Sequence, residues 1–245
     1  MSKNYEKKLI VSGDIYEIYE YSKPIIYDDQ KSHPSGRSKM ASDDDKDKNR
    51  YLTLHRASQT IRRLINANVG AWGCTPKFLT LTFAENVQDI KTANYQFKLF
   101  RQRLEYELEI KLKYVVVIEF QKRGAIHYHA VFFNLPYIKN NQLAEIWGNG
   151  FVKVNKIDQV DNIGSYVTKY MTKEEQDKVK MDRLRGEKSY FSSRNLKQPI
   201  EIREKEEIEQ LATALSQFKV YESSFENDYV GQIQYSQYNT KRCQK

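Results

Sequence analysis

The sequence is poor in cysteine, proline and glycine, with 2, 5 and 10 of them in 245 residues. The two cysteines, Cys74 and Cys243, are far apart in the chain and provide neither a disulfide framework nor a zinc cluster. Such scarcity is typical of a protein from a reducing compartment. No stretch approaches the ~18 consecutive apolar residues of a membrane span, and the first residues lack the apolar core of a secretory signal. We therefore expect a cytoplasmic protein with no membrane partner.

Positive charge is concentrated in the middle of the chain. Residues 1–50 contain 10 basic and 10 acidic side chains, and residues 201–245 contain 6 and 8. Residues 51–200 contain 24 and 14, a net charge of +10 in a chain whose overall charge is +8. The chain also has 18 tyrosines, whose rings can stack on bases. This distribution favours a nucleic-acid partner.

The two ends of the chain are expected to flank one folded domain. We expect residues 1–50 to be a flexible N-terminal segment with at most a short strand between Tyr16 and Tyr27. Within this segment, Gln30–Arg50 is nearly free of apolar residues and is expected to be a solvated linker. Residues 51–202 are expected to form the domain itself, and residues 203–245 a C-terminal extension with a charged helix and a hairpin.

Hydrophobic periodicity predicts an α+β domain, with a central antiparallel sheet and helices packed against it. The strand pattern is clearest in Lys77–Phe83, where apolar residues alternate, and the helix pattern in Ile90–Ile110, where they recur at spacings of three and four. The predicted elements are a helix over 51–69, a strand over 77–83, a helix over 90–110, strands over 114–121 and 125–133, a helix over 138–147, a strand over 151–155 and a helix over 159–173.

The most informative stretch is the predicted hairpin over residues 114–134, YVVVIEFQKRGAIHYHAVFFN. A three-residue loop, 122–124, separates its strands and has Gly124 at the last position, where the backbone of such loops is left-handed. This loop pairs Glu119 with His127 across the strands and sets His129 on the same face, because side chains alternate along a strand. Two imidazoles and a carboxylate on one face form a candidate metal site. The alternative is a pair of strand histidines with only a packing role.

The last predicted helix contains two tyrosines one turn apart, Tyr166 and Tyr170, with Lys169 between them. Its core stripe is Ile163, Val167 and Met171. On an ideal helix, Tyr170 lies about 60° from this stripe and Tyr166 about 100°. Tyr166 is therefore expected to be freer to reach a ligand. Taken alone, two tyrosines beside a core stripe are also compatible with simple packing.

Together, these segments resemble the HUH endonucleases of rolling-circle replication. The resemblance rests on the order of the KFLTLTF strand, the IHYHAVFF strand with Glu119 before it, and YVTKY on a later helix. The pattern with two tyrosines is similar to the initiators of single-stranded DNA phages. The segment SYFSSRNLKQPIEI, residues 189–202, resembles plasmid and phage initiators of the same group. The resemblance spans about residues 51–202 and implies an HUH/RRM-like fold.

The resemblance implies a rolling-circle replication initiator that nicks and rejoins single-stranded origin DNA at a specific site, through a 5′-phosphotyrosine intermediate. Tyr166, Tyr170 and Lys169 would then be the catalytic residues. The ligands of a Mg²⁺ or Mn²⁺ ion would be Glu119, His127 and His129. The sequence contains no GxxxxGK[ST] loop, so we expect no ATP-driven unwinding by this chain, and a host helicase and polymerase as partners.

Two other functions remain open at this point. A relaxase or a single-strand transposase would use the same site on a different DNA. A non-catalytic RRM-like domain would use its tyrosines only to stack bases, although it gives no reason for Glu119 to face His127.

Overall fold

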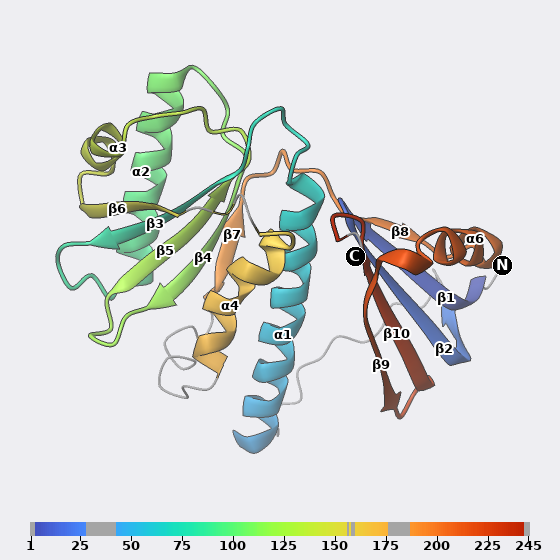
Figure 1. Ribbon diagram of the computed structural model, residues 1–245. Coiled ribbons are helices and arrows are strands. Elements are labelled where there is room, and N and C mark those ends of the chain that lie inside the picture. Colours follow the sequence, from blue (N-terminus) through green and yellow to red (C-terminus); the bar gives the residue numbers. More distant parts are fainter. Residues whose placement is uncertain (1–2, 28–42, 156, 158–159, 176–186, 243–245) are drawn as a thin grey trace. The chain divides into compact units, whose positions relative to one another are not determined.

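The computed structural model describes residues 3–27, 43–155, 157, 160–175 and 187–242 (Figure 1). The chain forms two compact units. We call residues 48–197 the central unit, and residues 1–47 together with 198–245 the terminal unit. Each unit contains one five-stranded antiparallel sheet in its described residues, which confirms the α+β class.

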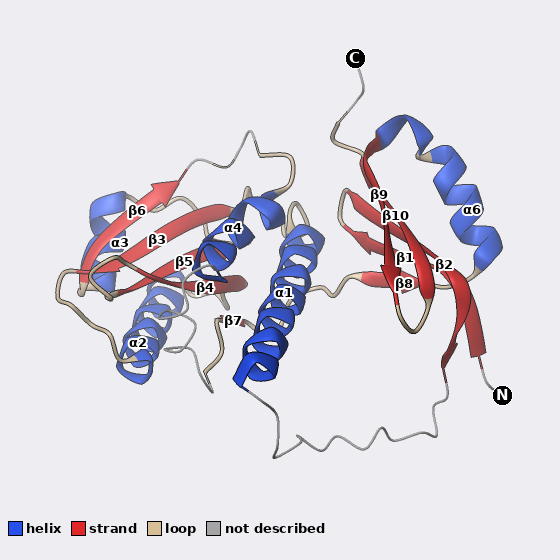
Figure 2. Cartoon of the chain, turned by 90° about the horizontal axis from the view of Figure 1, so that it is seen from below, coloured by secondary structure: helices blue, strands red, loops and turns tan. Residues whose placement is uncertain are grey.

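The sheet of the central unit has the strand order β6-β3-β5-β4-β7, and four helices belong with it (Figure 2). From Lys77 to the end of α4, the elements follow the predicted order β-α-β-β-α-β-α. The elements are α1 (Asp43–Asn68), β3 (Lys77–Phe83), α2 (Ile90–Leu108), β4 (Tyr114–Phe120), β5 (Ile126–Phe132), α3 (Asn140–Trp147), β6 (Gly150–Asn155), α4 (Ile163–Glu175) and β7 (Tyr190–Ser192).

Helices cover both faces of this sheet, as Figures 1 and 2 show. On one face, α2 and α3 pack against Leu79, Leu81 and Phe83 of β3, which are almost fully buried, as the alternation in the sequence predicts. On the other face, α1 and α4 pack against a smaller core. That second core consists mainly of Ile61, Leu64, Ile65, Phe78, Val115, Val117, Val131, Phe133, Ile163 and Val167. The second face is the one that carries the candidate site.

The central hairpin has the predicted register. Glu119 of β4 pairs with His127 of β5, and Val117 with His129. The Gly124 backbone is left-handed, with φ of 87°, and its N–H donates to the carbonyl of Gln121 to close the loop. A local loop therefore fixes which side chains share a face of the sheet.

The terminal unit combines segments from both ends of the chain. Its strand order is β8-β1-β2-β10-β9, and α6 packs on one face against Leu9, Ile18 and Tyr238. The predicted C-terminal helix and hairpin are present. The elements are β1 (Lys3–Ser12), β2 (Ile15–Tyr27), β8 (Ile200–Ile202), α6 (Lys205–Ala214), the short 3-10 helix η1 (Ser216–Phe218), β9 (Lys219–Asn227) and β10 (Gly231–Asn239).

The N-terminal segment differs from the sequence expectation in two places. Residues 3–27 form a two-stranded hairpin rather than one short strand, because β1 pairs with β8 and β2 with β10, strands about 200 residues away. The predicted linker over Gln30–Arg50 ends earlier than expected, since α1 begins at Asp43. Acidic residues stabilise the first turn of a helix, so the Asp43–Asp45 run suits this start. The linker residues 30–42 lie outside the described residues.

No helix in the described part of the chain combines the length and the apolarity needed to cross a lipid bilayer.

Candidate active site

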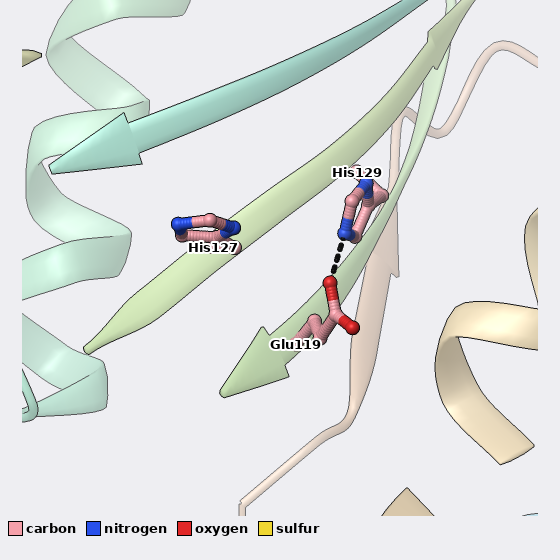
Figure 3. A group of neighbouring side chains, drawn as sticks. All are labelled: Glu119, His127 and His129. Atoms are coloured by element: carbon pink, nitrogen blue, oxygen red, sulfur yellow. Dashed lines mark hydrogen bonds and ion pairs between the residues drawn. The ribbon is translucent and has the colours of Figure 1, made fainter. Parts of the chain in front are cut away.

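The side chains of Glu119, His127 and His129 gather on the α1/α4 face of the central sheet (Figure 3). Each offers one ligand atom, and these atoms lie within 4.8 Å of one another. His129 is almost fully buried, whereas Glu119 and His127 are half-buried. The register of the β4–β5 hairpin therefore brings the three predicted ligands together.

His129 is fixed from both sides of its ring. Its Nε2 contacts the Glu119 carboxylate, and its Nδ1 lies 3.3 Å from the Thr80 hydroxyl. The Asn155 amide donates to this hydroxyl oxygen at 3.0 Å. A hydroxyl both donates and accepts, so Thr80 can pair with either tautomer of His129, including the one whose Nε2 lone pair is free for a metal.

His127 lacks such a partner. Its Nε2 is buried and makes no hydrogen bond within the described residues. Burial lowers the pKa of the His127 imidazole from 6.5 to about 4; the nearby His129 adds to this shift, and Glu119 opposes it. Near neutral pH, His127 is therefore a neutral imidazole with an unsatisfied ring nitrogen, which is the form that binds metals.

This group fits a divalent cation. An ion with bonds of about 2.1 Å separates opposite ligands by roughly 4 Å, so donors within 4.8 Å need only small side-chain adjustments. The carboxylate supplies negative charge, and a cation would satisfy the ring nitrogen of His127 that is otherwise unpaired. Glu119, His127 and His129 are the residues that would hold it.

Helix α4 brings both predicted tyrosines to the same group. The Tyr170 ring stacks on His129, with centroids 3.9 Å apart and planes 22° apart. The Tyr170 hydroxyl donates to the Tyr166 hydroxyl at 3.4 Å. Lys169 is exposed, and its ammonium lies 5.9 Å from the centre of the Tyr166 ring. The three predicted residues of α4 are thus next to one another and next to a candidate ligand.

The tyrosines also contact the apolar core. Both rings are half-buried and lie 5.6–5.7 Å from Phe78 between centroids. Burial raises the pKa of the Tyr170 hydroxyl above its ordinary value of 10; the hydrogen bond to Tyr166 and the negative charge of Glu119 act in the same direction. Tyr170 is therefore difficult to deprotonate when no cation is bound.

Helix α1 fixes the start of α4 through two asparagines. The Asn66 side-chain oxygen accepts from the Gly164 N–H at 2.8 Å, and its amide donates to Asn162 at 3.0 Å. Asn162 in turn accepts from the Ser165 N–H and caps the helix. The helices approach so closely that a Cβ on Gly164 would lie 2.2 Å from the Arg62 carbonyl oxygen. This contact sets where Tyr166 and Tyr170 meet the sheet.

The sequence analysis identified neither the residues that orient His129 nor those that hold α4. Thr80 could have been found, because the alternation of KFLTLTF puts it on one face and β3 pairs with β5. Asn155 and Asn66 come from elements whose place beside the site depends on tertiary packing. No local signal in the sequence marks them.

Comparison with known proteins gives one match. Residues 76–175, from the start of β3 to the end of α4, match a family described as replication-associated proteins of the ORF2 and gene-2-protein type. The match includes all six predicted site residues. No curated protein and no solved structure matches the chain. Over this part of its length, the chain is therefore similar to a family of replication-associated proteins, which is consistent with a role in DNA replication.

Proposed function

We propose that this chain is a rolling-circle replication initiator that nicks and rejoins single-stranded origin DNA through a tyrosine. The observation that carries the proposal is the stack of Tyr170 on His129, which brings a helix with two tyrosines against a candidate metal group. The family match over residues 76–175 supports a role in replication. The net charge of the central unit, with 26 basic and 14 acidic side chains, suits a polyanionic substrate.

Glu119, His127 and His129 would hold Mg²⁺ or Mn²⁺. When bound, the ion would supply positive charge that orients the scissile phosphate and stabilises the negative charge of the transition state. Thr80 keeps the His129 ring in place for this role through its hydrogen bond.

Tyr166 is the proposed first nucleophile. Its hydroxyl oxygen attacks the phosphorus of the scissile phosphodiester, a tyrosyl O–P bond forms, and the bond from phosphorus to the 3′-oxygen breaks. The tyrosine proton is lost to solvent, and the departing 3′-oxygen takes up a proton. The products are a 5′-phosphotyrosine linkage and a free 3′-hydroxyl that can prime synthesis. Lys169, beside the Tyr166 ring, supplies positive charge near the phenolate or the phosphate.

Tyr170 is the proposed second nucleophile. Its ring, rather than its hydroxyl, faces His129, and its raised pKa makes it the poorer nucleophile before the first cut. The hydrogen bond between the two hydroxyls keeps Tyr170 within reach of the same phosphate. After synthesis, Tyr170 would attack the regenerated junction, and the first linkage would be resolved by the free 3′-hydroxyl.

Two alternatives make different predictions. A relaxase or a single-strand transposase would perform the same chemistry, and its products would differ only in which DNA ends are joined. A non-catalytic RRM-like domain would bind single strands without forming a covalent product. The buried, unpaired nitrogen of His127 argues against this second alternative, because base stacking does not need it.

Unwinding and synthesis are assigned to partners. The sequence has no GxxxxGK[ST] loop, so a host helicase and polymerase, working in the cytoplasm, would act at the nick. ATP hydrolysis by the purified chain, stimulated by DNA, would contradict this assignment.

The test is covalent capture. The purified chain is incubated with Mn²⁺ and a pool of single-stranded oligonucleotides of randomised sequence, labelled at the 3′ end. The proposal predicts a labelled protein band that survives SDS and disappears in EDTA. If a pool that the protein binds yields no such band with Mn²⁺ or Mg²⁺, the chain is a binding domain and not a nuclease.

A further inference from the structure

The edge strand β6 exposes a large aromatic side chain in the middle of the central unit. Phe151 is 72% exposed, whereas its neighbour Val152 is 7% exposed and belongs to the core beneath α2 and α3. Because side chains alternate along a strand, Phe151 and Lys153 both point to the opposite face. Lys153 is exposed as well. An aromatic ring and a cation thus stand side by side at the edge of the sheet.

That face is the one that carries the candidate metal group. Phe151 pairs with Thr82, Thr82 pairs with His127, and His127 pairs with Glu119, so these four residues form one row across four strands. Adjacent strands lie about 4.8 Å apart, which puts the Phe151 backbone roughly 10 Å from that of His127. This spacing is on the scale of one or two nucleotides of an extended single strand.

Lys153 lies in the next row of the same face. It pairs with Thr80, which in turn pairs with His129. The aromatic side chain is therefore aligned with one histidine and the cation with the other.

The backbone that carries Phe151 is firmly held. Gly150, with φ of +147°, lies so close to β3 that a Cβ would be 2.4 Å from the Thr82 carbonyl oxygen. The Trp147 indole donates to the same oxygen at 3.1 Å. The Phe151 ring is thus presented from a rigid edge, although burial accounts for little of its surface. Unprotected aromatic residues on edge strands promote association, so such a position suits a ligand-binding surface.

We propose that Phe151 and Lys153 form a subsite for one nucleotide of the single-stranded DNA, adjacent to the phosphate that is cut. The base stacks on the Phe151 ring and its phosphate lies against the Lys153 ammonium. Stacking on an aromatic ring tolerates any base, so this subsite contributes affinity and alignment more than sequence choice. The charge of the central unit favours DNA over a protein partner at this edge. The subsite rests on the proposed function only for its position beside a cut.

The experiment measures binding without cleavage. A fluorescent oligothymidylate of about 16 nucleotides is titrated with the full chain in EDTA, and its anisotropy is followed. Phe151→Ala is expected to weaken binding about tenfold, whereas Phe151→Trp keeps the affinity and loses tryptophan fluorescence on binding. Lys153→Gln is expected to lower the slope of log K against log salt by about one. The matched control is Phe225→Ala, which removes an exposed phenylalanine, 48% exposed, from the edge strand β9 of the terminal unit.

The outcomes separate the subsite from the proposed function. If Phe151→Ala weakens binding and Phe225→Ala does not, the subsite is supported even when the wild type never forms a covalent adduct. If the wild type forms the adduct and Phe151→Ala binds and reacts equally well, the subsite is wrong and the proposed function stands. The subsite is also wrong if the wild type fails to bind the oligonucleotide at low salt. A change in oligomeric state in Phe151→Ala without a change in DNA affinity would assign the edge to a protein contact instead.

Discussion

The two five-stranded sheets of this chain differ in how their buried polar groups are used. In the terminal unit, the buried carboxylate of Glu17 accepts a hydrogen bond from the Tyr235 hydroxyl at 2.9 Å, so a charged group is satisfied within its own sheet. In the central unit, Glu119, His127 and His129 gather at one point, and one ring nitrogen stays unpaired within the described residues. No second group of three such ligands occurs in the part of the chain that the structure describes.

Charge separates the two units in the same way. The central unit has 26 basic and 14 acidic side chains, a net of +12, and the terminal unit has 14 and 18, a net of −4. Both units contain tyrosine clusters. In the terminal unit, Tyr19, Tyr221 and Tyr235 contact one another, whereas Tyr170 contacts a candidate metal ligand. What surrounds a tyrosine, rather than the number of tyrosines, therefore marks the candidate nucleophile.

The largest expected effect comes from removing the attacking oxygen. Tyr166→Phe should lower the rate of adduct formation by at least about 1,000-fold, because no O–P bond can form at that position. Tyr170→Phe should still make the first cut but should fail to rejoin. The rates are measured by SDS gel with a 3′-labelled oligonucleotide selected from the pool. Tyr221→Phe in the terminal unit, which lies in a tyrosine cluster but away from the metal group, is the control and should react like the wild type. A Tyr166→Phe protein that cuts normally would reverse the two assignments.

The next effect comes from the candidate metal ligands. His127→Ala should lower Mn²⁺-dependent adduct formation by at least about 100-fold, because one ligand and the oriented charge are lost together. DNA binding in EDTA should remain largely intact. His55→Ala replaces an exposed histidine of α1 and should leave both properties unchanged. Loss of binding and cutting together in His127→Ala would point to unfolding, which circular dichroism would detect.

A smaller effect is expected from the residue that orients His129. Thr80→Val keeps the shape of the side chain but removes the hydroxyl beside Nδ1, so Mn²⁺ affinity should fall about tenfold. Thr82→Val changes the same strand and the same face next to His127, and should have little effect. Affinities are measured by titrating Mn²⁺ and following its electron paramagnetic resonance signal. Equal affinities for the two variants would show that Thr80 plays no part in orienting the ligand.

The smallest expected effect is on stability in EDTA. The pKa of His127 is about 4 in the folded chain and near 6.5 when unfolded, so the unfolded chain binds more protons between these values. Stability should therefore fall as the pH is lowered from about 6.5 to about 4. The midpoint of thermal unfolding measures this loss, which should be smaller in His127→Gln than in the wild type. The same loss in both proteins would mean that His127 is not the group responsible.

The sequence predicted the site best where the determinants are local. The loop 122–124 fixes the register of Glu119 against His127, and a left-handed glycine at its end is a strong signal. The strand Lys77–Phe83 has the predicted bounds, because its alternation runs unbroken from end to end.

The parts that could not be predicted depend on distant partners. Pairing of β2 with β10 joins residues about 200 positions apart, and nothing in either strand identifies the other. Polar residues such as Glu17 also interrupt the apolar pattern of β2, although this glutamate is buried in the structure. The approach of α1 to α4 at Gly164 is likewise a property of packing, and a glycine inside a helix gives no hint of its neighbour.

The most direct test is to locate the tyrosine that carries the DNA. The wild-type chain is stripped with EDTA, given the selected oligonucleotide with or without Mn²⁺, and digested for mass spectrometry. The proposal predicts a nucleotide-bearing peptide only with Mn²⁺, and its modified residue is Tyr166 of α4. A modified tyrosine in the terminal unit, or an adduct formed equally well in EDTA, would contradict the assignment of nicking to the central sheet.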